Sequence, residues 1–330
     1  MTSAVTEFVM TTPQAQPQRI TAGPDGALWF TVTGFGPGAP NEIARITTDG
    51  TVTEYPIPTP SSEPIGIATG ADKNLWFAEG AANKIGRITP GGLITEYPLP
   101  TGVTEPLEVT KGPDGNIWFT AQQYVGRISP RGSIKVFSVP TQNAAPTDIT
   151  SGKDGALWFT ELLANQIGRV TTSGVFEEFP IPQGLSGPAG ITRGPDGKIW
   201  FSIGLGLATI NELGEITEFQ NHVGSYQVAS GPDGNMWFTT GTDKMGAFLR
   251  DKMKVSPAEL FLTVGQTQTF SVTEGGGRHT WTAVSQNPGV ATVSSAGPGS
   301  FSVTAVAQGV CAITVSDEEQ NSIDESVQVN

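Results

Sequence analysis

The chain has 330 residues, of which 37% are hydrophobic and 15% are charged, and its net charge is −13. Because it is acidic and has no cluster of Lys or Arg, we expect no nucleic acid partner and no docking on an anionic membrane surface. The single cysteine, Cys311, excludes an intrachain disulfide. No apolar run approaches the roughly 18 residues of a transmembrane helix, so we expect no membrane insertion.

The first predicted strand is VTEFVM at Val5–Met10. It has no obvious partner nearby, but it matches VTEYPI at 52–57. The residues before it contain neither the basic region nor the apolar segment of a secretory signal, so no signal peptide is visible.

Six copies of one eight-residue phrase follow, beginning with GPDGALWF at 23–30. The others lie at 70–77, 112–119, 152–159, 194–201 and 231–238. Successive tryptophans of these copies are 47, 42, 40, 42 and 37 residues apart. A repeat of this length indicates a repeat architecture in which each unit is one small structural module.

One repeat unit, 63–100, reads as four short strands at 63–70, 75–79, 83–89 and 93–100. Apolar and polar residues alternate along its last strand, and Pro and Gly occur too often for a helix. Six four-stranded antiparallel sheets with a period of about 40 residues predict a β-propeller.

We interpret the repeated eight-residue phrase as a turn followed by core-packing residues. Pro presets φ at the start of the turn, Asp bonds to nearby backbone, and Gly tolerates positive φ. The Trp and Phe that follow point to opposite faces of a strand, and both faces of a blade are covered by its neighbours. We therefore expect the tryptophans in the core between blades and not as sugar platforms.

The sixth unit has predicted strands at 226–231, 236–240 and 244–249 but no fourth strand. We infer that the strand at Val5–Met10 completes this last blade, which closes the ring and removes exposed sheet edges. The predicted fold is all-β: a six-bladed β-propeller over residues 1–250, closed by the N-terminal strand.

After residue 250 the repeat stops. Short alternating strands separated by Gly, Pro and Asn turns predict an immunoglobulin-like β-sandwich over residues 251–330. Trp281 and Cys311 are expected in its core.

The polar residues on the rim of the propeller supply the candidate binding site. Glu63, Glu105 and Glu108 could gather at the channel mouth and hold a cation, although a hydrated polar channel is the commoner arrangement. The loop around Phe35 is a candidate contact loop, because Trp29 and Ile43 are 14 residues apart where the second and fourth units have 9. His222, Tyr226 and Gln227 complete the candidates, and Glu79 and Glu161 are also placed on this rim. No catalytic triad, metal-ligand spacing or phosphate loop is present.

The phrases EPIGIATG and LWFAEGAANKIGRITPGGLITEYPLP resemble the virginiamycin B lyase family, and the resemblance covers about residues 5–250. The phrases SPAELFLTVGQTQTF, NPGVATVS and GVCAITVSD resemble bacterial immunoglobulin-like domains of group 2. The first resemblance implies a propeller, seven-bladed in the true enzymes, that opens the ring ester of streptogramin B antibiotics by elimination. It also implies a bound Mg²⁺ ion, a histidine base in the last blade, a metal-binding glutamate after the last aromatic pair, and a second histidine one blade earlier.

In this chain the positions that the resemblance assigns to catalysis carry other residues. The base position is Tyr226, the carboxylate before it is replaced by Gly224, the metal glutamate by Gly241, and the second histidine by Ala189. Proton abstraction near neutral pH needs a group that titrates there, and Mg²⁺ needs oxygen ligands. We therefore expect no catalytic residue of the family, no metal ligand and no cofactor.

Three functions follow as hypotheses. The first is a non-catalytic recognition or structural protein, displayed on a cell surface or built into a phage-type particle such as a tail or fibre. The second is a lyase-like or other propeller enzyme with a relocated, Mg²⁺-dependent site. The third is a carbohydrate-binding propeller. The expected partners are other proteins of a surface or virion assembly, or a cell-surface glycan. The expected location is extracellular or particle-associated, with the cytoplasm as an alternative.

Overall fold

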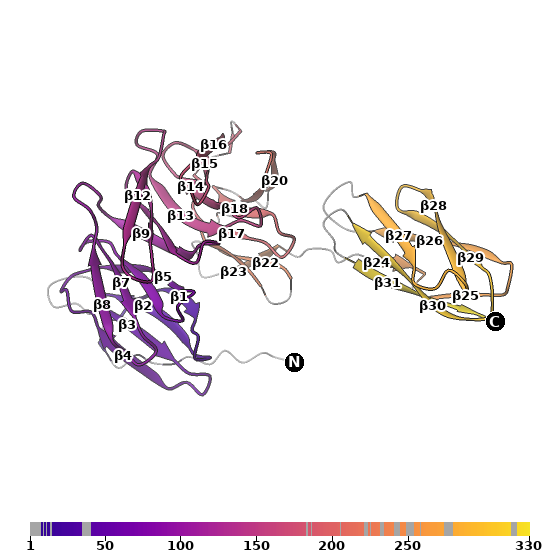
Figure 1. The fold of residues 1–330 in the computed structure, drawn as a ribbon, viewed down its shortest axis with the longest axis horizontal. Coiled ribbons are helices and arrows are strands. Elements are labelled where there is room, and N and C mark those ends of the chain that lie inside the picture. The colour runs from indigo at the N-terminus through magenta and orange to yellow at the C-terminus, as the bar shows by residue number, and fades with distance from the viewer. Residues whose placement is uncertain are drawn as a thin grey trace. The chain divides into compact units, whose positions relative to one another are not determined.

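The computed structural model consists of β-strands joined by turns (Figure 1). It divides into two compact units, one made of residues 1–194, 198–230 and 237–246, and the other of 195–197, 231–236 and 247–330. None of the described segments is a helix that could cross a membrane. The structure describes residues 8, 10, 12–13, 15–34, 41–182, 184–185, 187–204, 206–220, 224, 226–231, 234–240, 245–248, 254–257, 259–273, 280–317 and 322–330.

The described residues before 249 form six antiparallel sheets, which we number as blades one to six in chain order. Blades one to five have four strands each, ordered in space as in the chain. Their strands are β1 (Pro17–Ala22), β2 (Leu28–Thr33), β3 (Asn41–Ile46), β4 (Val52–Pro56), β5 (Pro64–Thr69), β6 (Leu75–Glu79), β7 (Lys84–Ile88), β8 (Ile94–Pro98), β9 (Pro106–Lys111), β10 (Ile117–Ala121), β11 (Tyr124–Ile128), β12 (Ile134–Ser138), β13 (Pro146–Ser151), β14 (Leu157–Glu161), β15 (Gln166–Val170), β16 (Phe176–Pro180), β17 (Ile191–Arg193), β18 (Ile199–Ile203), β19 (Gly206–Ile210) and β20 (Ile216–Gln220).

Blade six has three described strands, β21 (Val228–Ser230), β22 (Met236–Thr239) and β23 (Met245–Phe248). The innermost strands of successive blades lie side by side, β1 next to β5 and so on to β21, which confirms the propeller architecture. In blade two, β5 to β8 lie within the four segments expected from the sequence.

Of the predicted N-terminal strand, the structure describes Phe8 and Met10. The ring of Phe8 lies over Gly50 in blade one, where a Cβ atom would clash with it. Tyr55 of the fourth strand in blade one lies over Gly92 of blade two in the same way. Phe8 therefore contacts blade one in the same way that Tyr55, in the fourth strand of blade one, contacts blade two. This supports the inferred closing strand, and the blade number stays a prediction.

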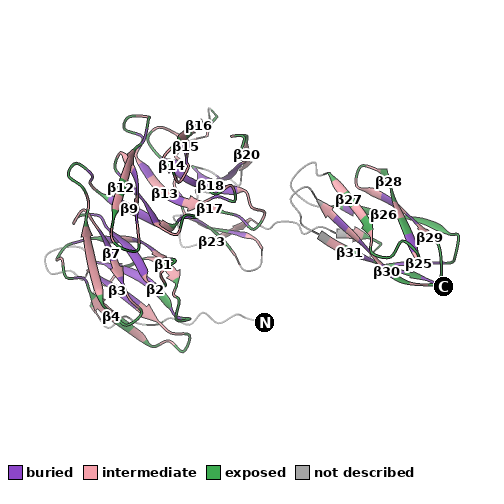
Figure 2. Ribbon diagram, in the orientation of Figure 1, coloured by how far each residue is buried: buried purple, intermediate pink, exposed green. Residues whose placement is uncertain are grey.

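The propeller core is built from aromatic residues shared between neighbouring blades. Trp76 of blade two packs in one cluster with Phe119 of blade three, and Trp118 packs with Phe159 of blade four. Buried residues concentrate on the inner strands and exposed ones on the turns (Figure 2). The expected packing role of these residues is confirmed for blades one to four. Trp237 of blade six differs, because 39% of its surface is exposed.

In blades one to four, the Asp of the turn accepts a hydrogen bond from the indole N–H of the tryptophan. In blade three, Asp114 accepts the indole N–H of Trp118 at 3.0 Å, and Arg127 donates to Asp114 at 3.0 Å. The indole of Trp118 also stacks on Phe137 of the fourth strand, with ring centroids 5.6 Å apart. The sequence indicated only a bond from Asp to nearby backbone; the bond to the indole adds a link between the turn and the core.

The second unit is a sandwich of two four-stranded sheets, ordered β24-β26-β29-β28 and β25-β31-β30-β27. Phe270 stacks on Phe301 in its core, with ring centroids 5.5 Å apart, and Cys311 is buried there as expected. Trp281 is partly buried and packs against this core. The strands are β24 (Lys254–Ser256), β25 (Glu259–Leu262), β26 (Thr267–Thr273), β27 (Trp281–Ser285), β28 (Ala291–Gly297), β29 (Ser300–Ala305), β30 (Gly309–Asp317) and β31 (Ser322–Val329).

The Asp114→Ala substitution tests the link between turn and core. It leaves the buried indole N–H of Trp118 without its acceptor, so we expect the free energy of unfolding to fall by about 1.5–3 kcal/mol. Denaturant unfolding followed by tryptophan fluorescence measures this change. The control is Asp49→Ala, which removes an exposed turn aspartate that contacts no indole and should change stability far less. Equal effects of the two substitutions would contradict the assigned role.

Candidate functional site

One position of each innermost strand faces its neighbours around the channel. It is the third residue of the innermost strand in blades one to four and the residue just before that strand in blades five and six. The six residues there are Arg19, Gly66, Glu108, Asp148, Gly190 and Gln227. Neighbouring members of this set approach each other closely. A Cβ atom at Gly190 would lie 2.8 Å from the Cα of Gln227. We call these residues the channel ring.

Arg19 and Glu108 form an ion pair across the channel ring. Arg19 Nε donates to Glu108 Oε1 at 2.5 Å, and the Glu108 side chain is 11% exposed against 34% for Arg19. Gly66 of the blade between them makes room, because a Cβ atom there would lie 2.7 Å from Glu108 Oε2. The pair therefore depends on a glycine in the intervening blade.

Asp148 extends the pair toward blade five. Its Oδ2 accepts the N–H of Ile191 at 2.9 Å, and its Oδ1 accepts the N–H of Ile149 at 2.8 Å. Burial and, after it, the charge of Asp148 raise the pKa of Glu108 to about 8, although Arg19 opposes the rise. Burial also raises the pKa of Asp148 to about 6. The pKa of each of the two carboxyl groups is therefore raised toward the neutral range.

Glu63 and Glu105 stand apart from this ion pair. Both are exposed, at positive φ of 50° and 53°, in the crossovers that enter blades two and three. Asn41 Oδ1 accepts the N–H of Glu63 at 2.9 Å, and Asn83 Oδ1 accepts that of Glu105 at 2.8 Å. Among the described residues, no three His, Cys, Asp or Glu side chains are placed to hold a metal ion.

Backbone hydrogen bonds fix the main chain of Tyr226, and its side chain is exposed. Its N–H donates to Thr239 O at 3.1 Å, its carbonyl accepts the N–H of Gly190 at 2.7 Å, and the residue is 58% exposed. Gln227 donates its N–H to the Thr239 hydroxyl at 3.0 Å. The other two sequence candidates, Phe35 and His222, lie outside the described residues, as does Gly241.

Two carboxyl groups that the sequence placed on the rim are buried. Glu79 and Glu161 end β6 and β14, are fully buried, and lie at the same position of two repeats. Neither carboxyl oxygen of Glu161 has a hydrogen-bond partner among the residues that the structure describes. Burial raises the pKa of Glu161 to about 8, and the nearby charge of Glu178 adds to the rise. In the sequence, these two positions are marked only by a glutamate that follows the Trp-Phe pair of the repeat. That pattern does not predict that the side chain is buried.

The substitution Glu161→Gln tests the buried carboxyl group. Its folded pKa lies above its unfolded value, so the folded state keeps a proton that the unfolded state loses between about pH 4.5 and pH 8. The free energy of unfolding should therefore fall as pH rises through this window. Gln carries no charge at either pH. The free energy of unfolding of the variant should therefore be about 1–3 kcal/mol higher than that of the wild type at pH 8, and equal to it near pH 4. Urea unfolding at both pH values measures this, with the exposed Glu212→Gln as control. Parallel pH profiles for all three proteins would refute the assignment.

Known proteins resemble both units. The family model described as virginiamycin B lyase family matches residues 1–246, and the model described as bacterial Ig-like domain (group 2) matches residues 251–326. No curated protein matches the chain.

Solved structures also match. A streptogramin B lyase structure is 36% identical, with a TM-score of 0.68, and the match covers 73% of this chain and 82% of that one. A catalytically inactive histidine-to-alanine variant of virginiamycin B lyase from Staphylococcus aureus, with quinupristin, is 32% identical, with a TM-score of 0.69 and coverage of 96% and 97%. An extracellular domain of a putative hybrid two-component system from B. thetaiotaomicron, 12% identical with a TM-score of 0.58 and coverage of 98% and 52%, shares the fold alone. The chain therefore belongs to the virginiamycin B lyase family and carries a bacterial immunoglobulin-like domain at its C-terminal end.

Proposed function

We propose that this protein is a non-catalytic recognition or structural protein, which uses the propeller of a lyase family as a binding scaffold. The observation that carries the proposal is the residue at the family's base position. That residue is Tyr226, whose backbone is fixed between blades five and six and whose side chain faces solvent.

The chemistry of the base position supports this proposal. An ordinary tyrosine titrates near pH 10, so it is a poor base at neutral pH. The solved virginiamycin B lyase with one histidine replaced by alanine is described as catalytically inactive. This chain has two histidines, His222 and His279, and neither occupies the position that the resemblance assigns to the base. Gly224 and Ala189 supply neither a carboxylate nor an imidazole.

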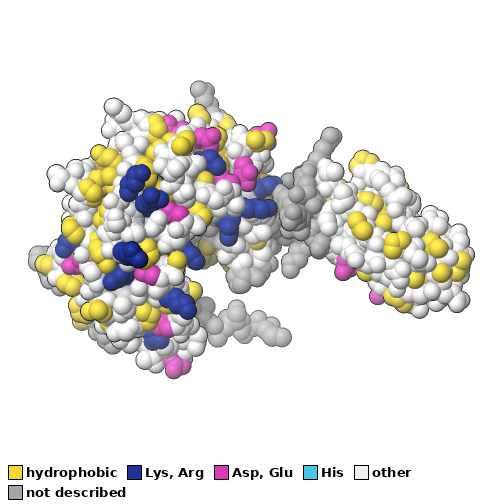
Figure 3. Space-filling model, viewed as in Figure 1, with side chains coloured by type: hydrophobic (Ala, Val, Ile, Leu, Met, Phe, Trp, Pro, Cys, Tyr) yellow, Lys and Arg dark blue, Asp and Glu magenta, His cyan; other side chains and the backbone are white. Residues whose placement is uncertain are grey.

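The channel ring supports the same reading. The charges of Arg19 and Glu108 satisfy each other, and both carboxylate oxygens of Asp148 accept backbone N–H groups. Groups that are already paired within the protein gain less from binding a charged substrate or a metal ion. Figure 3 also shows Lys and Arg side chains lying among Asp and Glu side chains on the visible face of the first unit.

The setting that we propose is extracellular or on the surface of a particle. The C-terminal domain belongs to a bacterial immunoglobulin-like group. By family association, we infer that it serves as a spacer in a surface or phage-type protein. Display on the cell surface or incorporation into a phage-type particle would both leave the propeller rim free to contact other proteins or a glycan.

A second candidate is a propeller enzyme with a relocated site. The carboxyl groups of Glu108 and Asp148 titrate near neutral pH, where acid–base catalysts work best. In that case Glu108 would exchange a proton with a substrate that enters the channel beside Arg19.

An activity assay separates the two candidates. The full chain is incubated with a streptogramin B antibiotic and Mg²⁺, and the ring is followed by liquid chromatography with mass spectrometry. Elimination gives a linear isomer of unchanged mass, which a shift in retention reveals. We expect no product above the protein-free control, with an authentic lyase as positive control. Turnover would contradict the non-catalytic proposal, and its loss in Glu108→Gln would assign it to the channel ring.

A further inference from the structure

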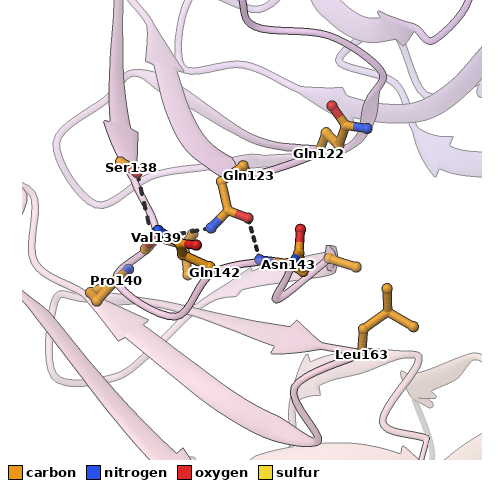
Figure 4. A pocket seen from close by; sticks show the side chains of 9 residues that line it. Gln122, Gln123, Ser138, Val139, Pro140, Gln142, Asn143 and Leu163 are labelled. Carbon is orange, nitrogen blue, oxygen red and sulfur yellow. Dashed lines mark hydrogen bonds between the residues drawn. The ribbon is translucent and has the colours of Figure 1, made fainter.

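A pocket lies on the propeller rim between blades three and four (Figure 4). Its volume is about 530 Å³, within the range of small-molecule sites. Three segments form its walls: the turn between β10 and β11, the crossover from β12 to β13, and Leu163 in the turn after β14. We call it the rim pocket.

A short turn in blade three creates the hollow. The strand pairing of β10 with β11 runs to Ala121 and Tyr124, so only two residues join these strands. In blades two and four the pairing ends at Glu79 with Lys84 and at Glu161 with Gln166, so four residues join each pair. Blade three therefore lacks two residues at the rim, and the pocket lies at this turn. Blade five also has a two-residue turn, but most of the crossover that follows it lies outside the described residues.

One lining residue fixes the shape of the pocket. Gln123 Nε2 donates to the carbonyls of Val139 and Thr141 at 3.2 and 2.8 Å, and its Oε1 accepts the N–H of Asn143 at 2.7 Å. Figure 4 shows the bonds from Gln123 to Val139 and Asn143. The crossover is thus held in one conformation, which reduces the entropy that a ligand must overcome.

The remaining polar side chains of the rim pocket are uncharged: they are amides and the hydroxyl of Ser138. Gln122 Oε1 accepts the hydroxyl of Thr104 at 3.0 Å, which leaves its NH₂ group available. The exposed side chains of Gln142 and Asn143 make no hydrogen bond to another described residue. Leu163, which is 72% exposed, adds an apolar wall. Amide donors and acceptors beside a small apolar surface therefore line the pocket, without any charged side chain.

We propose that the rim pocket binds a neutral glycan. A side-chain amide donates and accepts in one plane, which matches two adjacent hydroxyl groups that also donate and accept. The C–H face of a sugar ring can rest on Leu163. A charged ligand would lose hydration without meeting a counter-charge. An extended peptide needs a strand edge for pairing, whereas the pocket walls are turns and a crossover. This inference rests on the proposed recognition function and assigns its ligand class.

Neighbouring crossovers supply a matched substitution. Ala145 lines the pocket at φ 52°, and the equivalent residues before Pro64 and Pro106 are Glu63 and Glu105, at φ 50° and 53°. Ala145→Glu therefore keeps a backbone conformation in which this chain already accommodates glutamate, and it places a carboxylate in the pocket. The reverse change, Glu105→Ala, is the control at the equivalent position of the preceding crossover.

The experiment measures binding of the full chain to immobilised neutral oligosaccharides, with their sialylated and sulphated forms and a peptide panel alongside. We expect the wild-type chain to bind at least one neutral oligosaccharide. The Ala145→Glu variant should bind it at least tenfold more weakly, and the Glu105→Ala variant should bind it as the wild type does. Asn143→Gly should also weaken binding, while Ser61→Gly, at the equivalent exposed position with φ 51°, should not. Thermal unfolding of each variant shows that a loss of binding is not a loss of folding.

Several outcomes would overturn the inference: no binding to any neutral oligosaccharide, a preference for charged glycans, binding to peptides alone, or binding that Ala145→Glu leaves intact. These outcomes concern the ligand and leave the non-catalytic proposal standing. Ring opening of the antibiotic, with glycan binding unchanged, would instead overturn the non-catalytic proposal alone.

Discussion

The packing of an aromatic residue of one blade against an aromatic residue of the next is the interaction on which the propeller depends. Trp76 packs in the same buried cluster as Phe119, and Trp118 packs in the same cluster as Phe159. Each large ring removes much apolar surface from water, and the turn aspartate satisfies the one polar group of the indole. Because this contact recurs from blade to blade, the residues at the channel and on the rim are free to vary without loss of the fold.

The channel ring shows what that freedom allows. The same strand position is a cation in blade one, a glycine in blade two and an acid in blades three and four. The glycine lets Arg19 and Glu108 meet across a whole blade. The scaffold of a lyase family thus carries at its centre an internal ion pair, and an exposed Tyr226 stands at the family's base position. Fold and family are shared, while the groups that could do chemistry differ.

Loop length gives the rim its own features. A turn two residues shorter in blade three opens the rim pocket, and the amide of Gln123 reaches back to hold the crossover that lines it. Elsewhere the longer turns of blades two and four bond to their crossovers through backbone groups, as Gly80 does to Glu63. Small changes in turn length on a rigid scaffold are a common route to new binding surfaces.

The sequence by itself determined the all-β class, the four strands of the repeat at 63–100, the propeller and the immunoglobulin-like domain. These features are encoded locally, in turn residues and in the alternation of apolar and polar positions. Only the tertiary structure decided which side chains meet. Arg19 and Glu108 are 89 residues apart in the chain, and Glu161, which the sequence placed on the rim, is buried beside Glu178. Such contacts depend on how one blade stacks on the next, and a single repeat carries no record of that stacking.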